Sequence, residues 1–186
     1  MKDREKILRY FAATGEEAKE MAIRLLDIAD TVDRGRPFAV GPFMSPFAAQ
    51  VGQTVAAHMN TVTVQISGGY HEAERIRVAF LRNDYEGPVD FGMTALSVTW
   101  DDRYRLIGHR DVLGSLMGLG IERSVLGDIL MQGAGCQIVA DAGIAEWLIQ
   151  NFVKVAMVPV HVEEIPLSEL TPPVKTPKEV KATVAS

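Results

Sequence analysis

The sequence contains a single cysteine, Cys136, and this scarcity excludes a framework of internal disulfides. It also lacks any run of the ~20 apolar residues that a membrane-spanning helix requires. The first five residues are of mixed charge and lead into an amphipathic pattern, which excludes a secretory signal peptide. These absences predict a cytoplasmic protein in a reducing compartment, with no membrane partner.

An excess of positive charge is also missing, since the formal net charge is −5 at pH 7. Domains that bind nucleic acid over a broad basic surface usually have a high pI. The cations are nevertheless unevenly distributed, because lysine occurs only towards the two ends of the chain and the centre carries arginine alone. Arginine presents a planar fork to phosphate oxygens and stacks on bases. Two interpretations stay open: a local surface for RNA, and a solvated surface of mixed charge. The central arginines are Arg75, Arg77, Arg82, Arg103, Arg105, Arg110 and Arg123.

The one glycine-dense stretch, residues 108–120, does not match a nucleotide-binding loop. It contains neither GxxxxGK[ST] nor a GxGxxG placed between a strand and a helix. The triplet His109-Arg110-Asp111 resembles a kinase catalytic loop only by chance, because no glycine-rich ATP loop precedes it and no Asp-Phe-Gly follows. The sequence therefore predicts no nucleotide cofactor.

Candidate metal and catalytic residues are equally sparse. His71 with Glu72 and Glu74 lacks the second pair of ligands that a metal site needs. Cys136 has no histidine and aspartate companions in register, and it fits a small core residue. The sequence predicts a protein without catalysis, metal, cofactor or small-molecule substrate. An unrecognised enzyme stays open as a third hypothesis, and it would require a pocket with a perturbed acid–base pair.

The first third of the chain is helical in its pattern. In the second of the expected helices, apolar residues recur at i, i+3 and i+4 spacing. Ser45-Pro46 is typical of a helix start, with a hydroxyl N-cap followed by proline at the first helical position. We expect a small helical domain over residues 1–59, with helices over 3–12, 16–33 and 46–58.

From residue 60 the pattern changes to strands alternating with helices. Two helices on one face of a mostly antiparallel sheet is the natural packing of such a series. The fold class predicted is α+β, with a ferredoxin-like or RRM-like domain over residues 60–166. Residues 167–186 are rich in proline and lysine and predict a linker. The expected elements are strands over 61–66, 76–81 and 94–100, a helix over 110–119, a hairpin of 129–131 and 137–140, a helix over 142–153 capped by Asp141, and a strand over 158–165.

Two short segments are candidates for contact with RNA. Arg75 and Arg77 are two residues apart in a strand pattern, so their side chains point to one face. An aromatic side chain such as Tyr70 beside them could stack on a base while the arginines hold its phosphate. The alternative is a charged outer face of the sheet. His109, Arg110 and Asp111 begin a predicted helix. The free backbone N–H groups at its start can hold an anion, and the alternative is that Asp111 only initiates the helix. Gly114 and Gly118 lower helix propensity, which predicts close approach of another backbone.

Three segments resemble the YlmH family of bacterial RNA-binding proteins: Ser67-Gly68-Gly69-Tyr70-His71-Glu72-Ala73-Glu74-Arg75, the whole of 108–120, and Gly127-Asp128-Ile129-Leu130. Residues 151–155 and 162–167 are similar to the end of the family's central domain, and Ser45-Pro46 to the start of its third helix. The resemblance implies a helical N-terminal region, an RNA-recognition-like central domain and a C-terminal alpha-L RNA-binding domain, of the type named for ribosomal protein S-four. We expect this chain to stop before that last domain.

The resemblance also implies the partners of the chain. These are ribosomal RNA, tRNA and the large ribosomal subunit, in rescue or quality control of stalled particles. A protein-interaction scaffold linked to bacterial cell division is the alternative hypothesis. The residues expected to contact RNA are Tyr70, His71, Arg75, Arg77, His109, Arg110, Arg123 and Lys154.

Overall fold

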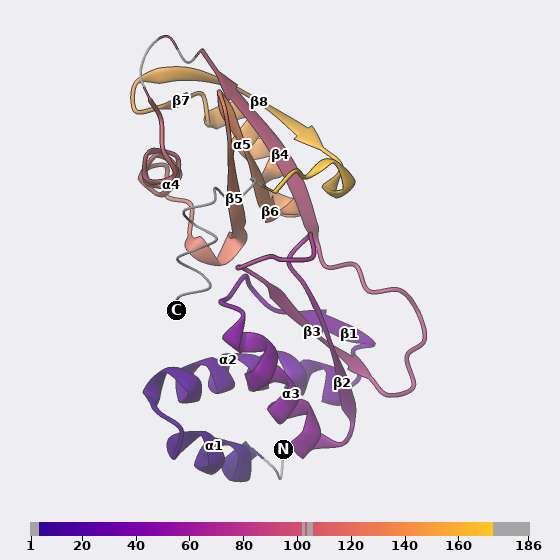
Figure 1. Cartoon of the computed structure of the whole chain (residues 1–186). Helices are drawn as coiled ribbons and strands as arrows, with labels where there is room; N and C mark the ends of the chain where they lie inside the picture. The colour runs from indigo at the N-terminus through magenta and orange to yellow at the C-terminus, as the bar shows by residue number, and fades with distance from the viewer. Residues whose placement is uncertain (1–3, 102, 104–105, 173–186) are drawn as a thin grey trace.

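The computed structural model describes residues 4–101, 103 and 106–172. These residues form two units, each with its own sheet and hydrophobic core. Figure 1 shows the first unit at the bottom and the second above it, joined by residues 83–92, which loop out at the side. The α+β fold class expected from the sequence is confirmed.

The first unit packs three helices against a three-stranded antiparallel sheet of order β1-β3-β2. The apolar stripe of the second helix explains this packing, because its buried residues Leu25, Leu26 and Ala29 share a core with Phe80 in the sheet. The elements are α1 (Arg4–Ala12), α2 (Glu16–Asp33), β1 (Phe38–Val40), α3 (Phe47–Met59), β2 (Val62–Ser67) and β3 (Arg77–Arg82).

The division between the two units differs from the boundary expected after residue 59. Strands β2 and β3, expected to open the central domain, pair with each other in the first unit. Val62, Val78 and Phe80 bury their side chains in the same core as the helices, so these strands belong to the first unit. Strand β1 was not predicted, because glycines and prolines surround it in the sequence.

The second unit is a five-stranded antiparallel sheet of order β5-β6-β4-β8-β7 with two helices. Strands β4, β5, β6 and β8 with these helices follow the βαββαβ order of ferredoxin-like and RNA-recognition folds. Strand β7 adds a short hairpin to β8. The elements are β4 (Met93–Trp100), α4 (His109–Gly118), β5 (Leu126–Gln132), β6 (Gly135–Asp141), α5 (Ala145–Asn151), β7 (Lys154–Val155) and β8 (Val158–Ile165), with short 3-10 helices η1 (Arg123–Val125), η2 (Ala142–Ile144) and η3 (Leu167–Glu169).

The core of the second unit lies between the sheet and its helices. Leu96, Val98 and Trp100 of β4 alternate along the strand and face this core, where Leu116 of α4 and Leu148 of α5 are fully buried. The intervening residues of β4 therefore face the opposite side of the sheet. None of the helices among the described residues is long and apolar enough to cross a bilayer.

The starts of the helices show which of the predicted capping residues are confirmed by the structure. The Asp141 carboxylate accepts a hydrogen bond from the Gly143 N–H at 2.7 Å, as its expected capping role requires. Helix α3 begins one residue later than Ser45-Pro46 predicts, with Pro46 at the N-cap and no side-chain cap. The close approach expected at Gly114 and Gly118 is wrong, because a Cβ at either position would meet nothing within 4 Å among the described residues.

The start of the expected linker is ordered against the second sheet. The Gln137 side chain donates to the carbonyl oxygen of Glu169 at 3.2 Å and accepts from the Thr171 N–H at 2.6 Å. Gln132 donates to the carbonyl oxygen of Thr171 at 2.6 Å. Residues 166–172 therefore cross the sheet from β8 towards β5, and the rest of the expected linker, 173–186, lies outside the described residues.

Candidate functional site

The loop of residues 68–76 leaves the first unit and contacts the second, forming a junction between the two. The Tyr70 hydroxyl donates a hydrogen bond to Oδ2 of Asp128 in β5. The same oxygen accepts the backbone N–H of Glu74 at 2.8 Å. One carboxylate of the second unit thus binds two groups of the loop, which fixes the loop against the sheet edge.

Burial sets the electrostatics of this contact. Asp128 is the buried charged residue among those described, at 7 % exposure, so its charge depends on these hydrogen bonds. Burial raises the pKa of the Tyr70 hydroxyl above its ordinary value, and the hydrogen bond to Asp128 raises it further. Tyr70 is therefore a neutral donor to a buried carboxylate.

Arg75 holds three carbonyl groups from separate parts of the chain. Its Nη2 donates to the carbonyl oxygens of Phe43 at 3.2 Å and of Arg123 at 2.7 Å. Its Nε lies 3.4 Å from the carbonyl oxygen of Leu126, which is a weaker contact. Burial lowers the pKa of the Arg75 guanidinium, and the nearby charge of Arg123 lowers it further. The rigid fork of arginine suits this bridging role.

Arg77 makes a second bridge on the other side of the junction. Its Nη1 lies 2.9 Å from Oδ2 of Asp141 and 3.1 Å from the carbonyl oxygen of Gly92, while Nε donates to the carbonyl oxygen of Gly41 at 2.7 Å. The guanidinium also lies over the ring of Phe43, 5.1 Å from its centroid. The Arg77 side chain is 11 % exposed. Both arginine side chains therefore extend towards the second unit, where Arg75 binds the carbonyl oxygen of Arg123 and Arg77 binds Asp141.

The expected RNA-contacting residues therefore fall into two groups. Tyr70, Arg75 and Arg77 have partners within the chain, and Arg123 donates to the carbonyl oxygen of Gly127 at 3.2 Å while its own carbonyl binds Arg75. The remaining four side chains are exposed to solvent: His71, His109, Arg110 and Lys154.

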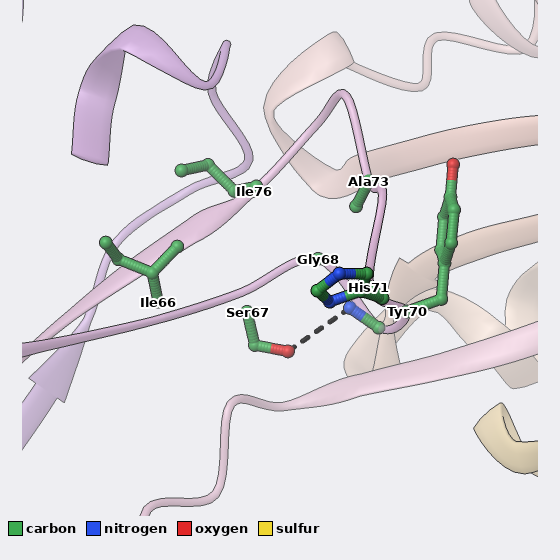
Figure 2. A pocket seen from close by; sticks show the side chains of 8 residues that line it. Ile66, Ser67, Gly68, Tyr70, His71, Ala73 and Ile76 are labelled. Atoms are coloured by element: carbon green, nitrogen blue, oxygen red, sulfur yellow. Dashed lines mark hydrogen bonds between the residues drawn. The ribbon is translucent and has the colours of Figure 1, made fainter. Parts of the chain in front are cut away.

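His71 lies on the junction loop beside a shallow cavity of about 380 Å³. Figure 2 shows its ring over this cavity, with Tyr70 pointing away from it, and the hydrogen bond from the Gly69 N–H to Oγ of Ser67 that tightens the loop. Gly68 has to be glycine here, because a Cβ would lie 2.6 Å from the carbonyl oxygen of Arg75. The loop is thus shaped by its own backbone, which places His71 outside and Tyr70 against the second unit.

His109 and Arg110 begin α4, which packs against β7, where Lys154 lies. At this helix start the Gly108 N–H donates to Oδ2 of Asp111 at 2.9 Å. The carboxylate already supplies negative charge to the helix N-terminus, so the structure favours helix initiation over an anion held there by the backbone. The exposed cations of α4 and β7 stay available to solvent.

The sheet face opposite the helices differs from a base-stacking surface. RNA-recognition domains stack bases on aromatic side chains of their central strands. The residues of β4 and β6 that alternate with the core-facing ones are small, polar or aliphatic, and residues 166–172 cover part of this face. Contact with RNA by this unit would therefore depend on cations. These outward positions are Ala95, Ser97, Thr99, Gly135, Gln137 and Val139.

Two residues of the junction were missed at the sequence level. Asp128 lies within one of the segments that carry the family resemblance, but a lone aspartate gives no sign of burial. Asp141 was expected to cap a helix, and it does so with Oδ1 while Oδ2 binds Arg77. Only the fold reveals these long-range partners.

Fold and junction together define a two-unit α+β protein whose second unit has the RNA-recognition topology. A family model described as "YlmH, N-terminal" matches residues 17–85, and one described as "Putative RNA-binding domain in YlmH" matches residues 87–169. The chain belongs to the YlmH family, as its sequence motifs indicated.

The known proteins that are similar to the chain include one from Bacillus subtilis and one from Streptococcus pneumoniae. The "Ribosome-associated protein quality control protein P2" of Bacillus subtilis (strain 168) is 35 % identical over 114 residues, which cover 60 % of this chain and 44 % of that relative. The alignment thus spans less than half the length of the relative. The solved structure of "Cell division protein ylmH from Streptococcus pneumoniae" has a TM-score of 0.71 at 23 % identity, covering 83 % of this chain and 94 % of the other. This second likeness shows the shared fold.

Proposed function

We propose that the chain is a non-catalytic RNA-binding protein that acts on ribosomal RNA or tRNA, in quality control at the large ribosomal subunit. The observation that carries this proposal is the match of residues 87–169 to a family model named for RNA binding. The name of the Bacillus relative, which refers to ribosome association and quality control, supports the ribosome as the partner. Both names describe binding or a cellular process rather than a reaction.

The exposed cations of the second unit support a phosphate-directed contact. Arg110 and Lys154 are exposed on two elements that pack together, with the exposed ring of His109 next to Arg110. His71 is exposed on the junction loop. Because the net charge of the chain is −5, only a few phosphates can be neutralised in one place. If three are, log affinity falls with log salt at a slope of roughly −2. Such binding is weak and suits a protein that is held on a ribosomal particle by several contacts.

A charge-matched pair of variants tests this surface. The double variant R110A/K154A removes two cations from the second unit, and K6A/R9A removes two exposed cations from α1. Fluorescence anisotropy with labelled tRNA and with a large-subunit rRNA fragment gives the affinity over a series of salt concentrations. We expect R110A/K154A alone to reduce the salt slope, by about 1.5. Equal effects of the two variants would mean that only total charge matters, and this surface would then be rejected.

A protein-interaction scaffold is the second candidate, and exposed apolar side chains favour it. Leu106 is 94 % exposed and Met157, at the turn between β7 and β8, is 79 % exposed. Large exposed apolar side chains mark a protein contact when they gather in one patch, so the scaffold hypothesis requires these two side chains to share a contact surface. The scaffold hypothesis predicts no salt-dependent binding of RNA and no effect of R110A/K154A in the anisotropy experiment.

A further inference from the structure

A cleft of about 360 Å³ opens between the two units, beside the junction. It lies where α2, the segment before α3, the junction loop and η1 meet, so four separate parts of the sequence contribute to it. Its volume falls in the range of sites for small ligands. The lining residues are Glu17, Glu20, Met21, Arg24, Phe43, Met44, Ser45, Arg75, Arg123 and Ser124.

Three arginines from three separate elements line this cleft. Arg75 and Arg123 are half-buried, and Arg24 on α2 is exposed, with no partner among the described residues. The bonds of Arg75 use Nε and Nη2, and the bond of Arg123 uses Nη1. Within the described part of the chain, Nη1 of Arg75 and Nη2 of Arg123 therefore have no acceptor. These donors are held in place by the junction and remain free for a ligand.

The charges around Arg75 and Arg123 are not balanced. The two guanidinium groups repel each other, and the carboxylate that interacts with both is Asp128. Asp128 also accepts the Tyr70 hydroxyl and the Glu74 N–H, so its charge is shared among several donors. An anion in the cleft would relieve the repulsion between the arginines.

Other groups of the cleft modify its preference for an anion. Ser45 adds a hydroxyl group, which donates readily to a phosphate oxygen. The Ser124 hydroxyl already donates to Oε2 of Glu122 at 3.4 Å, a weak bond that a phosphate would have to replace. Glu17 and Glu20 lie three residues apart on the same face of α2 and are exposed to solvent. Their carboxylates oppose an anion, although water screens them better than it screens the half-buried arginines. The cleft thus suits a moderate affinity for a single phosphate group.

We propose that this cleft holds one phosphate group of an RNA backbone, bound by Arg75, Arg123 and Arg24. The volume leaves space for the attached sugar. This inference rests on the proposed function, and it locates an RNA contact between the two units rather than on the sheet of the second. It also gives the junction a purpose beyond stability, because Tyr70, Asp128 and the carbonyl groups around Arg75 hold the phosphate-binding donors in a fixed arrangement.

The test compares matched variants of the 186-residue chain by anisotropy with a labelled single-stranded oligoribonucleotide of about ten nucleotides. R24A removes the exposed arginine of the cleft, and R36A removes an exposed arginine elsewhere. E17Q/E20Q removes the opposing carboxylates, and E5Q/E86Q removes two exposed carboxylates outside the cleft. We expect R24A to weaken binding about fivefold more than R36A does, and E17Q/E20Q to tighten it several-fold more than E5Q/E86Q.

Because these side chains are exposed, all four variants should keep the urea midpoint of the parent chain. If RNA still binds but the two variants of each matched pair have equal affinities for it, the proposal for the cleft is overturned and the proposed function stands. If the parent chain itself does not bind RNA, both the proposed function and the proposal for the cleft are rejected.

A further experiment titrates the chain with inorganic phosphate alone and follows the amide signals of residues 43–45 by NMR. If these amide signals shift with phosphate but not with the oligoribonucleotide, the cleft is a site for free phosphate, and the proposal is overturned.

Discussion

Tyr70 and Asp128 lie 58 residues apart in the chain, yet the hydroxyl of the first donates a hydrogen bond to the buried carboxylate of the second. Tyr70 belongs to a glycine-containing loop of the first unit, and Asp128 belongs to β5 of the second. With Arg75 and Arg77 on the same loop, this contact connects two units that have separate hydrophobic cores. The relative position of the units therefore depends on these polar contacts and on Phe43, which is buried and whose N–H donates to the carbonyl oxygen of Ser124 at 2.9 Å.

Removing the Tyr70 hydroxyl should lower the free energy of unfolding. We expect Y70F to lose about 2 kcal/mol, because the hydrogen bond is made to a charged group. D128A should lose more, since both Tyr70 and the Glu74 N–H would then lack their acceptor. Urea unfolding of Y70F, D128A and the double variant measures these values and their coupling. Additive losses in the double variant would mean that the two side chains do not interact.

The same contact predicts a loss of stability at alkaline pH. The folded state raises the pKa of Tyr70 above its unfolded value of about 10, so the stabilisation is fully present below that pH. It is lost as the pH rises from about 10 towards the pKa of the folded state, because a tyrosinate that is partly buried and lies beside the Asp128 carboxylate is unfavourable. Urea midpoints measured between pH 8 and pH 11 should converge for the parent chain and Y70F. A constant difference over this range would contradict the assignment.

Arg77 should matter far more for stability than Arg82, which lies in the same strand. The Arg77 side chain is 11 % exposed and pairs with Asp141, whereas the Arg82 side chain is 44 % exposed and pairs with its neighbour Asp84. We expect R77A to lower the free energy of unfolding by about 3 kcal/mol, because Asp141 loses its partner in a partly buried site. R82A should change it by less than about 1 kcal/mol. Thermal unfolding of both variants provides the comparison. If R77A loses no more unfolding free energy than R82A, the Arg77 bridge does not stabilise the chain as we expect.

Cys136 should be unreactive in the folded chain. Its side chain is 2 % exposed in the core of the second unit, and burial raises the pKa of its thiol to about 12. A colorimetric disulfide reagent at about pH 8 should give no signal until denaturant is added, and then one thiol per chain. Fast reaction in native buffer would mean that the second unit opens readily, contrary to its packed core.

The sequence predicted the helices and most strands because their apolar periodicity is strong and local. The apolar stripe of α2 led to the correct helix, and the strand-like runs over 61–66 and 94–100 led to β2, β4 and the α+β class. What it could not predict was that β2 and β3 belong to the sheet of the first unit rather than to that of the second. Alternation tells which residues of a strand are buried, and it does not tell which sheet they are buried against.

The candidate site shows a similar limit. The spacing of Arg75 and Arg77 correctly placed both side chains on one side of the chain, and the face they share meets the second unit. Their partners are mainly carbonyl groups of Gly41, Phe43 and Gly92, which no residue type in the sequence could have indicated. The family resemblance marked the loop and Asp128 without separating a structural contact from one with RNA. That distinction depends on burial.

Co-sedimentation with purified large ribosomal subunits tests the central claim most directly. At about 50 mM salt we expect the chain to pellet with the subunits, and at about 200 mM to be largely released, because the contact is made through a few phosphates. The double variant R110A/K154A should pellet less than K6A/R9A at the lower salt. If the parent chain stays in the supernatant at both salt concentrations, or binds equally at both, a phosphate-directed contact with the large subunit is contradicted.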